Sequence, residues 1–465
     1  MQIHAIGSNR SAAHPALAGG SCPGRAGTHR SLDEAASAAQ AAFGELSELS
    51  VSDRKRVIAA MRDAARAEAS ELARRSLVET GLGRFADKLK KHELAIEKTP
   101  GVESLEATTS RGDNGICIED LAPWGVIGVI TPCTNPTETI INNAISMLAA
   151  GNTMVICPHP AAREVSIHCV EVLNRAIAAA GGPPNALNIL AEPNLEQARA
   201  LIVHPRIGTL TVTGGPAVVQ EAMASNKTVV AAGPGNPPAV VDETADLDLA
   251  ARKLVAGASF DNNIVCVDEK QVVCVESIEQ ALIERMLAEG AYLLSAEELS
   301  RLERLVLKQA RPGPQESIID KAWVGKDAAL LLDRIGVRVA EEPRLLVART
   351  GHDHPFVWTE LLMPILAVTT APDADAAIEL GIRTERNNQH TVVIHSNDVR
   401  RITKMSRLAR ASIVVANGSG IDGLGAAGEG YTSFTIASPT GHGLTTARTF
   451  ARRLRTTAVG ALARA

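Results

Sequence analysis

Short runs of apolar residues alternate with helical segments along the middle of the chain, and this alternation restricts the possible fold more than any other feature. The apolar runs cover residues 126–130, 154–157, 186–190, 207–212 and 228–231. The segments with helical spacing between them cover residues 137–150, 162–180 and 217–224. Strands that are apolar at every position are typical of parallel sheets, in which helices cover both faces. The sequence therefore predicts an α/β fold built on a parallel sheet.

The flanking segments add elements on both sides of this sheet. Ser31 and Glu34 form a capping-box pattern at the start of one helix, and two more helices are expected over residues 52–80 and 84–98. A turn at residues 112–115 predicts a strand-turn-strand unit. A second α/β unit begins at about residue 237; its elements are helices near 246–259 and 278–287 and a strand at 271–275. A chain of 465 residues is long enough for two or three domains.

Composition excludes several classes of protein. The net charge of −5 provides no general basic field, so nucleic acid is not an expected partner. Seven cysteines with no CxxC pair argue against a disulfide framework and a zinc site, so no metal is predicted and a reducing, cytoplasmic location is expected. Residues 1–30 show no periodicity and no long apolar run, which predicts a loosely ordered segment and no signal peptide. Residues 139–162 are uncharged, but asparagine, glycine and proline interrupt them, which argues against a membrane span.

One glycine-rich stretch matches the sequence motif of a dinucleotide-binding loop but lacks its expected surroundings. Gly423, Gly425 and Gly428 spell GxGxxG, but that fingerprint requires a helix directly afterwards and an acidic residue about 20 positions further on. Residues 431–436 are predicted to form a strand, and no acidic residue follows Glu429. We therefore interpret the run as a close-packed connection.

A second glycine pair is better placed for binding a phosphate. Gly214 and Gly215 follow an apolar run, and Pro216 lies in the first turn of the next predicted helix. Backbone N–H groups at such a helix start can face a pyrophosphate. The alternative is that this turn needs glycine for steric reasons alone.

The seven cysteines lie in three kinds of surroundings. Cys22 belongs to the N-terminal segment, whereas four cysteines lie in apolar runs and are predicted to be core residues: Cys117, Cys157, Cys169 and Cys274. Cys133 lies beside an Asn-Pro loop, and Cys266 follows an irregular stretch that contains two asparagines. Reactive groups are common in such loops, and a thiolate both attacks and leaves readily. A thioester-forming nucleophile is therefore expected at one of the two loops.

Several longer segments occur in a recognisable order. They are LAPWGVIGVITPCTNP at 121–136, GN at 151–152, CPHP at 157–160, TGG at 213–215, GPGNPP at 233–238, the loop of Cys266, TELLMP at 359–364 and YTSFTIASPTG at 431–441. Together they resemble the aldehyde dehydrogenase superfamily, and within it the CoA-acylating branch of bacterial microcompartment propionaldehyde and acetaldehyde dehydrogenases. The resemblance extends from about residue 30 to residue 455.

The resemblance implies a fold of three parts. An aldehyde dehydrogenase-like chain has a Rossmann-type cofactor-binding domain, here residues 31–105 and 124–235, and an α/β catalytic domain, here residues 236–438. Residues 106–123 and 439–465 would form a small oligomerisation extension. Family members are dimers or dimers of dimers, so a homo-oligomer is expected.

The resemblance also implies catalytic roles. Cys266 matches the family nucleophile, which attacks the aldehyde carbonyl and becomes an acyl-thioester after hydride leaves. In the family, a side chain that follows the apolar run at residues 126–130 donates a hydrogen bond to the oxyanion. The match of the surrounding motif leaves both Asn135 and Thr134 open for this role. The backbone N–H of Cys266 would be the second donor.

Further positions match the cofactor site of the family. Gly214 and Gly215 match the pyrophosphate turn, with Thr131 and Pro132 nearby. Glu360 matches the carboxylate that holds the nicotinamide ribose. Where hydrolytic members have a lysine that grips the adenosine ribose, this chain has Cys157; His159, two residues on, is a candidate contact for the adenosine of NAD or CoA, and a loop histidine bonded to backbone is the alternative.

One departure from the hydrolytic branch indicates the acyl acceptor. Hydrolytic members carry a glutamate general base 34 residues before the nucleophile, and this chain has Ala232 there. A methyl group cannot take a proton from water, so hydrolysis of the acyl-enzyme is expected to be slow. A thiol such as CoA needs no such base, which agrees with acyl transfer.

The function that follows is oxidation of acetaldehyde or propionaldehyde with NAD and transfer of the acyl group to CoA. NADP remains open as the cofactor. The alternatives are the reverse reaction, from an acyl-CoA or acyl phosphate to the aldehyde, and a catalytically silent microcompartment assembly protein. Shell or cargo proteins are further candidate partners, and the sequence leaves open whether the chain lies inside a microcompartment.

Overall fold

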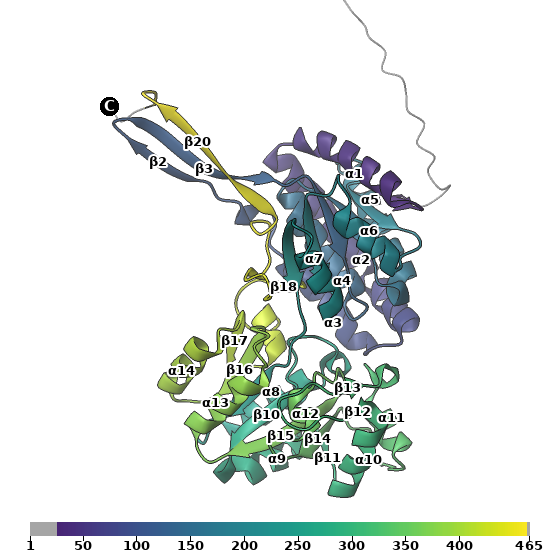
Figure 1. Ribbon diagram of the computed structural model, residues 1–465, viewed down its shortest axis with the longest axis vertical. Helices are drawn as coiled ribbons and strands as arrows, with labels where there is room; N and C mark the ends of the chain where they lie inside the picture. The colour runs from purple at the N-terminus through teal and green to yellow at the C-terminus, as the bar shows by residue number, and fades with distance from the viewer. Residues whose placement is uncertain (1–25, 463–465) are drawn as a thin grey trace, which may run out of the picture.

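The computed structural model describes residues 26–462, which form two α/β units and a projecting arm (Figure 1). The described part of the first unit contains a six-stranded sheet in the order β1-β6-β5-β4-β7-β8, in which every pairing is parallel. Its strands are β1 (Thr28–His29), β4 (Val126–Ile130), β5 (Thr153–Cys157), β6 (Leu187–Leu190), β7 (Thr209–Thr213) and β8 (Thr228–Ala232). Its helices are α1 (Leu32–Ser47), α2 (Val51–Thr80), α3 (Phe85–Lys98), α4 (Pro136–Ala149), α5 (Arg163–Ala179), α6 (Leu195–Val203) and α7 (Pro216–Met223). The prediction of a parallel α/β sheet is confirmed.

Helices cover both faces of this sheet because successive strand residues point to opposite sides. In β4, Val126 and Ile130 pack against α1, α6 and α7, whereas Ile127 and Val129 belong to the core shared with α2, α4 and α5. All five residues of the strand are buried. This two-sided burial explains why the strand reads as a continuous apolar run rather than as an alternating pattern.

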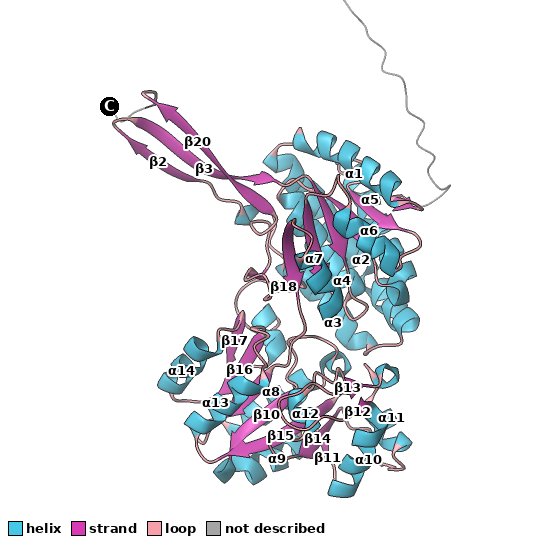
Figure 2. Ribbon diagram, viewed as in Figure 1, coloured by secondary structure: helices cyan, strands magenta, loops and turns pink. Residues whose placement is uncertain are grey.

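The second unit repeats the arrangement with a different strand order. Its described sheet has seven strands, all paired in parallel, in the order β11-β14-β15-β10-β9-β16-β17 (Figure 2). These are β9 (Pro238–Val241), β10 (Gln271–Val275), β11 (Ala291–Leu293), β14 (Leu345–Arg349), β15 (Ile365–Ala371), β16 (Thr391–His395) and β17 (Ile413–Ala416). The helices are α8 (Leu247–Ala258), α9 (Glu279–Ala288), α10 (Ala296–Val306), α11 (Ala328–Arg334), α12 (Pro355–Trp358), α13 (Ala374–Thr384) and α14 (Val399–Ala409). A small antiparallel pair, β12 (Leu307–Gln309) with β13 (Ile318–Ile319), completes it. A second pair, β18 (Ile436–Ala437) with β19 (Gly443–Leu444), lies next to β8 of the first unit.

The arm is an antiparallel sheet in the order β2-β3-β20. The strands β2 (Thr108–Gly112) and β3 (Gly115–Pro123) meet at the predicted turn, and β20 (Ala451–Val459) pairs with β3 over its whole length. Cys117, predicted to be a core residue, is half-exposed in β3, because no second layer among the described residues covers this sheet. By contrast, Cys157, Cys169 and Cys274 are buried as predicted.

Two local predictions are wrong. Thr28 and His29, within the segment predicted to be loosely ordered, pair with β6 as β1; residues 1–25 of that segment, with Cys22, lie outside the described residues. Residues 431–436 are irregular up to Ile436, because their backbone donors bond elsewhere: Phe434 N donates to the side chain of Asn142 at 3.1 Å. No helix among residues 26–462 is both long and apolar enough to cross a bilayer.

Candidate active site

A strained loop carries Cys266 between the 3-10 helix η3 (Phe260–Asn263) and β10. Asp261, Asn262 and Asn263 have φ values of 43°, 56° and 64°. This left-handed region is unfavourable for residues other than glycine, and each such residue costs on the order of 1–3 kcal/mol. Three in succession persist only where the surrounding structure stabilises them.

Polar contacts hold that loop from the other unit. The Asp261 carboxylate accepts hydrogen bonds from Lys88 Nζ at 3.2 Å and Lys91 Nζ at 2.6 Å, both on α3. Both lysines and Asp261 have side chains with no exposed surface. Asn262 Nδ2 donates to the carbonyl oxygen of Gly325 at 2.9 Å. The loop conformation is therefore tied to elements outside its own strand.

Lys270, just before β10, also holds the loop of Cys266 through hydrogen bonds. Its Nζ donates to the backbone and side-chain oxygens of Asn263 at 2.8 and 2.7 Å, and to Val265 O at 3.0 Å. These three bonds use all the donors of an ammonium group. They also place a positive charge beside the nucleophile loop.

Cys266 itself is half-buried between the buried Val265 and Val267. Burial, with a smaller contribution from the negative charge of Glu360, raises the pKa of Cys266 to about 12 despite the nearby Lys270. Burial likewise raises the pKa of Glu360 to about 7, against the opposing charge of Lys270. At neutral pH the thiol is therefore protonated and must lose its proton as it attacks.

Residues 233–238 bring Glu360, Cys266 and His390 to one place. Gly235 N donates to Glu360 Oε1 at 3.4 Å. A Cβ added at Gly235 would lie 2.6 Å from Cys266 O and 3.1 Å from His390 Cγ. Glycine is required here because three functional groups converge on its backbone.

His390 is a neutral imidazole at this point of convergence. Burial, together with the charge of Lys270, lowers the pKa of His390 to about 3. Its Nδ1 lies 2.9 Å from Thr391 Oγ1. Its Nε2 is buried and has no hydrogen-bond partner among the described residues. The ring can therefore interact with a proton on a bound molecule.

The oxyanion side of the site lies between β4 and α4. Asn135 is buried as the N-cap residue of α4, and its Oδ1 accepts a hydrogen bond from Lys91 Nζ at 2.6 Å. Its Nδ2 makes a longer contact, 3.3 Å, with Oγ1 of the half-exposed Thr134. Since Lys91 also bonds Asp261, Asn135 lies beside the loop of Cys266. The contact with Lys91 leaves the amide N–H groups of Asn135 available, which favours Asn135 over Thr134 as donor.

The candidate cofactor residues lie at the carboxyl ends of the first sheet. Gly214 and Gly215 connect β7 to α7, and a Cβ on either would meet nothing within 4 Å. A backbone with open space at a helix start fits the approach of a pyrophosphate. Thr131 and the half-exposed Pro132 directly follow β4, on the same edge.

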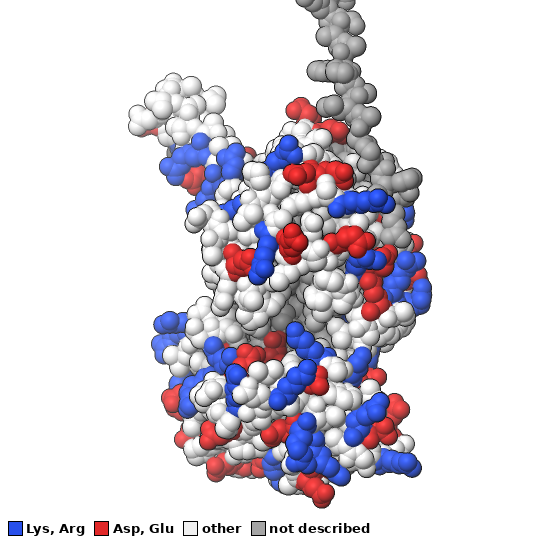
Figure 3. Space-filling model, turned by 45° about the vertical axis from the view of Figure 1, so that its right-hand side comes forward, with Lys and Arg blue, Asp and Glu red and all other residues white. Residues whose placement is uncertain are grey.

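His159 has the backbone contact of the alternative interpretation. Its Nδ1 accepts a hydrogen bond from Ala161 N at 3.1 Å, which caps a short 3-10 helix. Burial and the charge of Lys321, in the second unit, lower the pKa of His159. His159 therefore lies near a positive charge of the second unit, and Figure 3 shows that the surface between the two units is hollowed.

Ala232, which stands where hydrolytic aldehyde dehydrogenases have the glutamate base, lies at the end of β8. Ala232 is 34 residues before Cys266, is buried, and directly precedes the loop of residues 233–238. Its methyl group can neither accept nor donate a proton.

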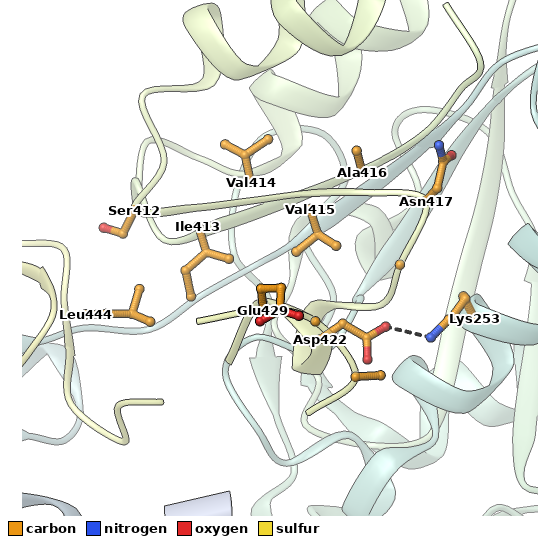
Figure 4. Close-up of a pocket in the computed structure, with 14 residues that line it drawn as sticks. Lys253, Ser412, Ile413, Val414, Val415, Ala416, Asn417, Asp422, Glu429 and Leu444 are labelled. Atoms are coloured by element: carbon orange, nitrogen blue, oxygen red, sulfur yellow. Dashed lines mark hydrogen bonds and ion pairs between the residues drawn. The ribbon is translucent and has the colours of Figure 1, made fainter. Parts of the chain in front are cut away.

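The run Gly423, Gly425 and Gly428 does not form a dinucleotide loop. It belongs to a 3-10 helix and an irregular segment, with no α-helix after Gly428 in the described chain. It lines a surface pocket beside the edge strand β17, where Asp422 bonds Lys253 at 2.9 Å (Figure 4). Glu429 and Asp422 both line this pocket, and their negative charges would repel a pyrophosphate.

Sequence reasoning missed His390 and the two α3 lysines. His390 lies in a polar loop before β16, where no periodic pattern marks it. The two lysines could have been found from their spacing. Lys88, Lys91 and Ala95 are three and four residues apart and so share one face of the helix. A charged residue at such a core-facing position indicates a buried partner.

Comparison with known proteins adds independent information. A family model described as "Aldehyde dehydrogenase family" matches residues 11–431. The chain is 45% identical, over 94% of its length and 93% of the relative's, to "Acetaldehyde dehydrogenase (acetylating) EutE" of Escherichia coli. A crystal structure of Rhodopseudomonas palustris propionaldehyde dehydrogenase with bound CoA and an acylated cysteine has a TM-score of 0.90 at 43% identity, and covers 94% of this chain and 99% of that one. A propionaldehyde dehydrogenase from a Clostridium phytofermentans fucose utilisation bacterial microcompartment has a TM-score of 0.90 at 40% identity, over 93% of this chain and 98% of that one.

The charge of Glu360 is expected to slow alkylation of Cys266. In Glu360→Gln, the pKa of Cys266 should fall because a negative charge beside the thiolate is removed, and alkylation by iodoacetamide should be severalfold faster. Glu360 ionises near pH 7, so the difference should be small below pH 6 and should grow as the pH rises through 7. The measurement is the alkylation rate against pH, with Cys266→Ala giving the rate of the other thiols. Identical profiles for the two proteins would exclude this electrostatic coupling.

Proposed function

The chain belongs to the aldehyde dehydrogenase family, and from this premise we propose that it oxidises a short aldehyde, acetaldehyde or propionaldehyde, and transfers the acyl group from Cys266 to CoA. The observation that carries the proposal is Ala232. The candidate nucleophile and the candidate ribose-binding carboxylate are both retained, whereas the base needed for hydrolysis is a methyl group. The similar acetylating and propionaldehyde dehydrogenases support the same reaction.

NAD is the proposed cofactor, and when bound it supplies the hydride acceptor. The open turn at Gly214 and Gly215, which follows β7 at the carboxyl end of the first sheet, fits its pyrophosphate. The Glu360 carboxylate, in the loop between α12 and β15, is the proposed acceptor of hydrogen bonds from its nicotinamide ribose.

The first half of the reaction is covalent catalysis by Cys266. Its sulfur attacks the aldehyde carbonyl carbon while the thiol proton passes to solvent water, and the anion of a thiohemiacetal forms. The Asn135 amide and the backbone N–H of Cys266 donate hydrogen bonds to the carbonyl oxygen as it becomes negative. Loss of hydride from the same carbon leaves an acyl-thioester on Cys266.

The second half transfers the acyl group to CoA. The CoA thiol loses its proton to His390 Nε2, attacks the thioester carbonyl, and releases Cys266 as the leaving thiolate. The proton can then return to Cys266. His390 has the geometry for this role because its Nδ1 is held by Thr391 and its Nε2 is free among the described residues. Its pKa of about 3 keeps it unprotonated at neutral pH but makes it a weak base, so the proton moves as the sulfur attacks.

The main test is CoA dependence. With purified protein, aldehyde and NAD, formation of NADH should require CoA, and Cys266→Ala should abolish it. The measurement is NADH absorbance with and without CoA for both proteins. Equal turnover without CoA would contradict the argument from Ala232, and the absence of turnover with several short aldehydes in both directions would favour the assembly protein.

His390 should act after hydride transfer. In His390→Ala, a single burst of NADH, about one per active site, is expected in the first turnover, whereas steady-state turnover with CoA should fall about 10²–10⁴-fold because the general base is missing. Rapid-mixing absorbance measures both phases. Thr391→Val is the matched control, since it removes the contact at Nδ1 but keeps the ring. Loss of the burst in His390→Ala would place the residue in the first half-reaction instead.

We infer that the arm takes part in assembly into a homo-oligomer. It projects from the rest of the described chain, and no helix or sheet among residues 26–462 covers it (Figure 1). Val459 is 83% and Leu454 41% exposed on β20. A sheet with open edges and exposed apolar residues is suited to pairing with a second copy. The source of one structural relative further supports a location inside a bacterial microcompartment.

Charge on the arm should therefore weaken assembly. The double substitution Leu454→Asp with Val459→Asp is expected to lower the molar mass measured by light scattering after gel filtration at micromolar concentration. Val51→Asp, at the exposed start of α2, is the control that should leave the mass unchanged. A wild-type chain that is monomeric, or a mutant of unchanged mass, would contradict the inference.

A further inference from the structure

Lys91 occupies a central position between the two halves of the site. It lies on α3, in the first unit, and its side chain has no exposed surface. Its Nζ lies 2.6 Å from Asp261 Oδ2, 2.6 Å from Asn135 Oδ1 and 3.2 Å from Thr134 O. An ammonium group has three N–H donors, which these three oxygens can accept. One of the three oxygens belongs to the nucleophile loop and two belong to the oxyanion side. A fourth oxygen, Oε1 of the buried Glu138, lies 3.5 Å from Nζ as a longer ion pair.

The contact with Asn135 determines how its amide is turned. An amide offers an oxygen that accepts and an NH₂ group that donates. Because Lys91 can only donate, it binds the oxygen and turns the NH₂ group away from itself. Without the ammonium, the two ends of the amide could exchange places, and the carbonyl oxygen of Asn135 would then face the developing negative charge.

The contact with Asp261 anchors the strained loop. Asp261 begins the left-handed run that leads to Cys266, and its carboxylate lies between Lys88 and Lys91. Lys91 therefore fixes the start of the nucleophile loop relative to the oxyanion donor.

Stability alone does not account for a buried lysine here. Burial acts to lower the pKa of Lys91, but the charges of Asp261 and Glu138 outweigh it, so the group stays charged. Removing two charges from water is expensive, and well-packed apolar residues of similar volume are often equally or more stable. A geometric requirement of the site is a sufficient reason to keep the charge.

We propose that Lys91 is a positioning residue for the first half-reaction: it orients the Asn135 amide so that its N–H groups face the oxyanion and fixes that amide relative to the Cys266 loop. The proposal rests on the proposed role of Asn135 as an oxyanion donor. Lys91 does not touch the aldehyde, so its effect on the rate must pass through Asn135.

Lys88 is the matched control. It lies three residues earlier on the same helix, is equally buried, and contacts the same Asp261 oxygen at 3.2 Å. Within residues 26–462 it makes no hydrogen bond with Asn135 or Thr134. Replacement of Lys88 removes a buried charge and a loop contact but leaves the amide of Asn135 held.

The test is a double-mutant cycle on the full-length protein. Steady-state kcat and KM are measured with aldehyde, NAD and CoA for Lys91→Met, Asn135→Ala and the double variant, and for the same set with Lys88→Met. Thermal unfolding and gel filtration identify the variants that fold, and Lys91→Gln, whose amide can also accept a hydrogen bond, replaces Lys91→Met if the latter does not fold. Lys91→Met should lower kcat about 10²–10³-fold, as loss of an oxyanion donor does, with a smaller change in KM.

The double-mutant cycle distinguishes the orientation of Asn135 by Lys91 from a general loss of structure when a buried lysine is replaced. In the Asn135→Ala background, Lys91→Met or Lys91→Gln should cost no more than a few-fold, because the group that Lys91 orients is gone, whereas Lys88→Met should cost the same factor in both backgrounds. If a Lys91 substitution costs the same factor with and without Asn135, the proposal is overturned. If Asn135→Ala alone leaves kcat unchanged, the proposed oxyanion role fails first, and the role of Lys91 fails with it.

Discussion

The ion pair between Lys91 and Asp261, 2.6 Å long and without exposed surface, connects two units that are otherwise built on separate sheets. Cys266 is attached to the second sheet, whereas Asn135 is attached to the first. A reaction at one carbonyl group requires these two side chains within a few tenths of an ångström of a fixed separation. An exposed salt bridge could not provide this because water and salt weaken it, but a buried pair strongly resists separation, since each charge would remain unpaired in a medium of low dielectric.

The parallel sheets could be predicted from the sequence because burial on both faces leaves a direct trace. Val126–Ile130 is apolar at every position since helices cover both sides, and Ser31 marks the start of α1 because its side chain accepts the hydrogen bond of Glu34 N. The wrong predictions concern short apolar or β-branched stretches, because such stretches occur both in buried strands and outside them. Cys117 looks like a core residue, but it lies on an uncovered sheet, and residues 431–436 look like a strand, although side chains such as Asn142 bind their backbone donors.

The residues of the candidate site also differ in how far the sequence alone points to them. Cys266, Glu360 and the glycine turn lie in local motifs, so their roles could be predicted from their sequence neighbourhood. His390 and Asp261 acquire their significance only from the fold: His390 meets Cys266 across Gly235, and Asp261 meets a lysine 170 positions earlier in the chain, as 261 minus 91 shows. No local pattern encodes such distant pairs. The argument that favours Asn135 over Thr134 likewise uses the structure, because it depends on which atom Lys91 binds.

The same buried surroundings help to explain why a thiol suits this site as the acyl acceptor. A base in a region of low dielectric is weak when protonation would create an unpaired charge, and the pKa of His390 is accordingly lowered to about 3. Water, with a pKa of about 15.7, would give up a proton to such a base only at great cost. A free thiol has a pKa of about 8.5, roughly 7 units lower, and each unit corresponds to about 1.36 kcal/mol. With Ala232 in place of a carboxylate, a site whose remaining imidazole is this weak can assist attack by CoA far more readily than attack by water.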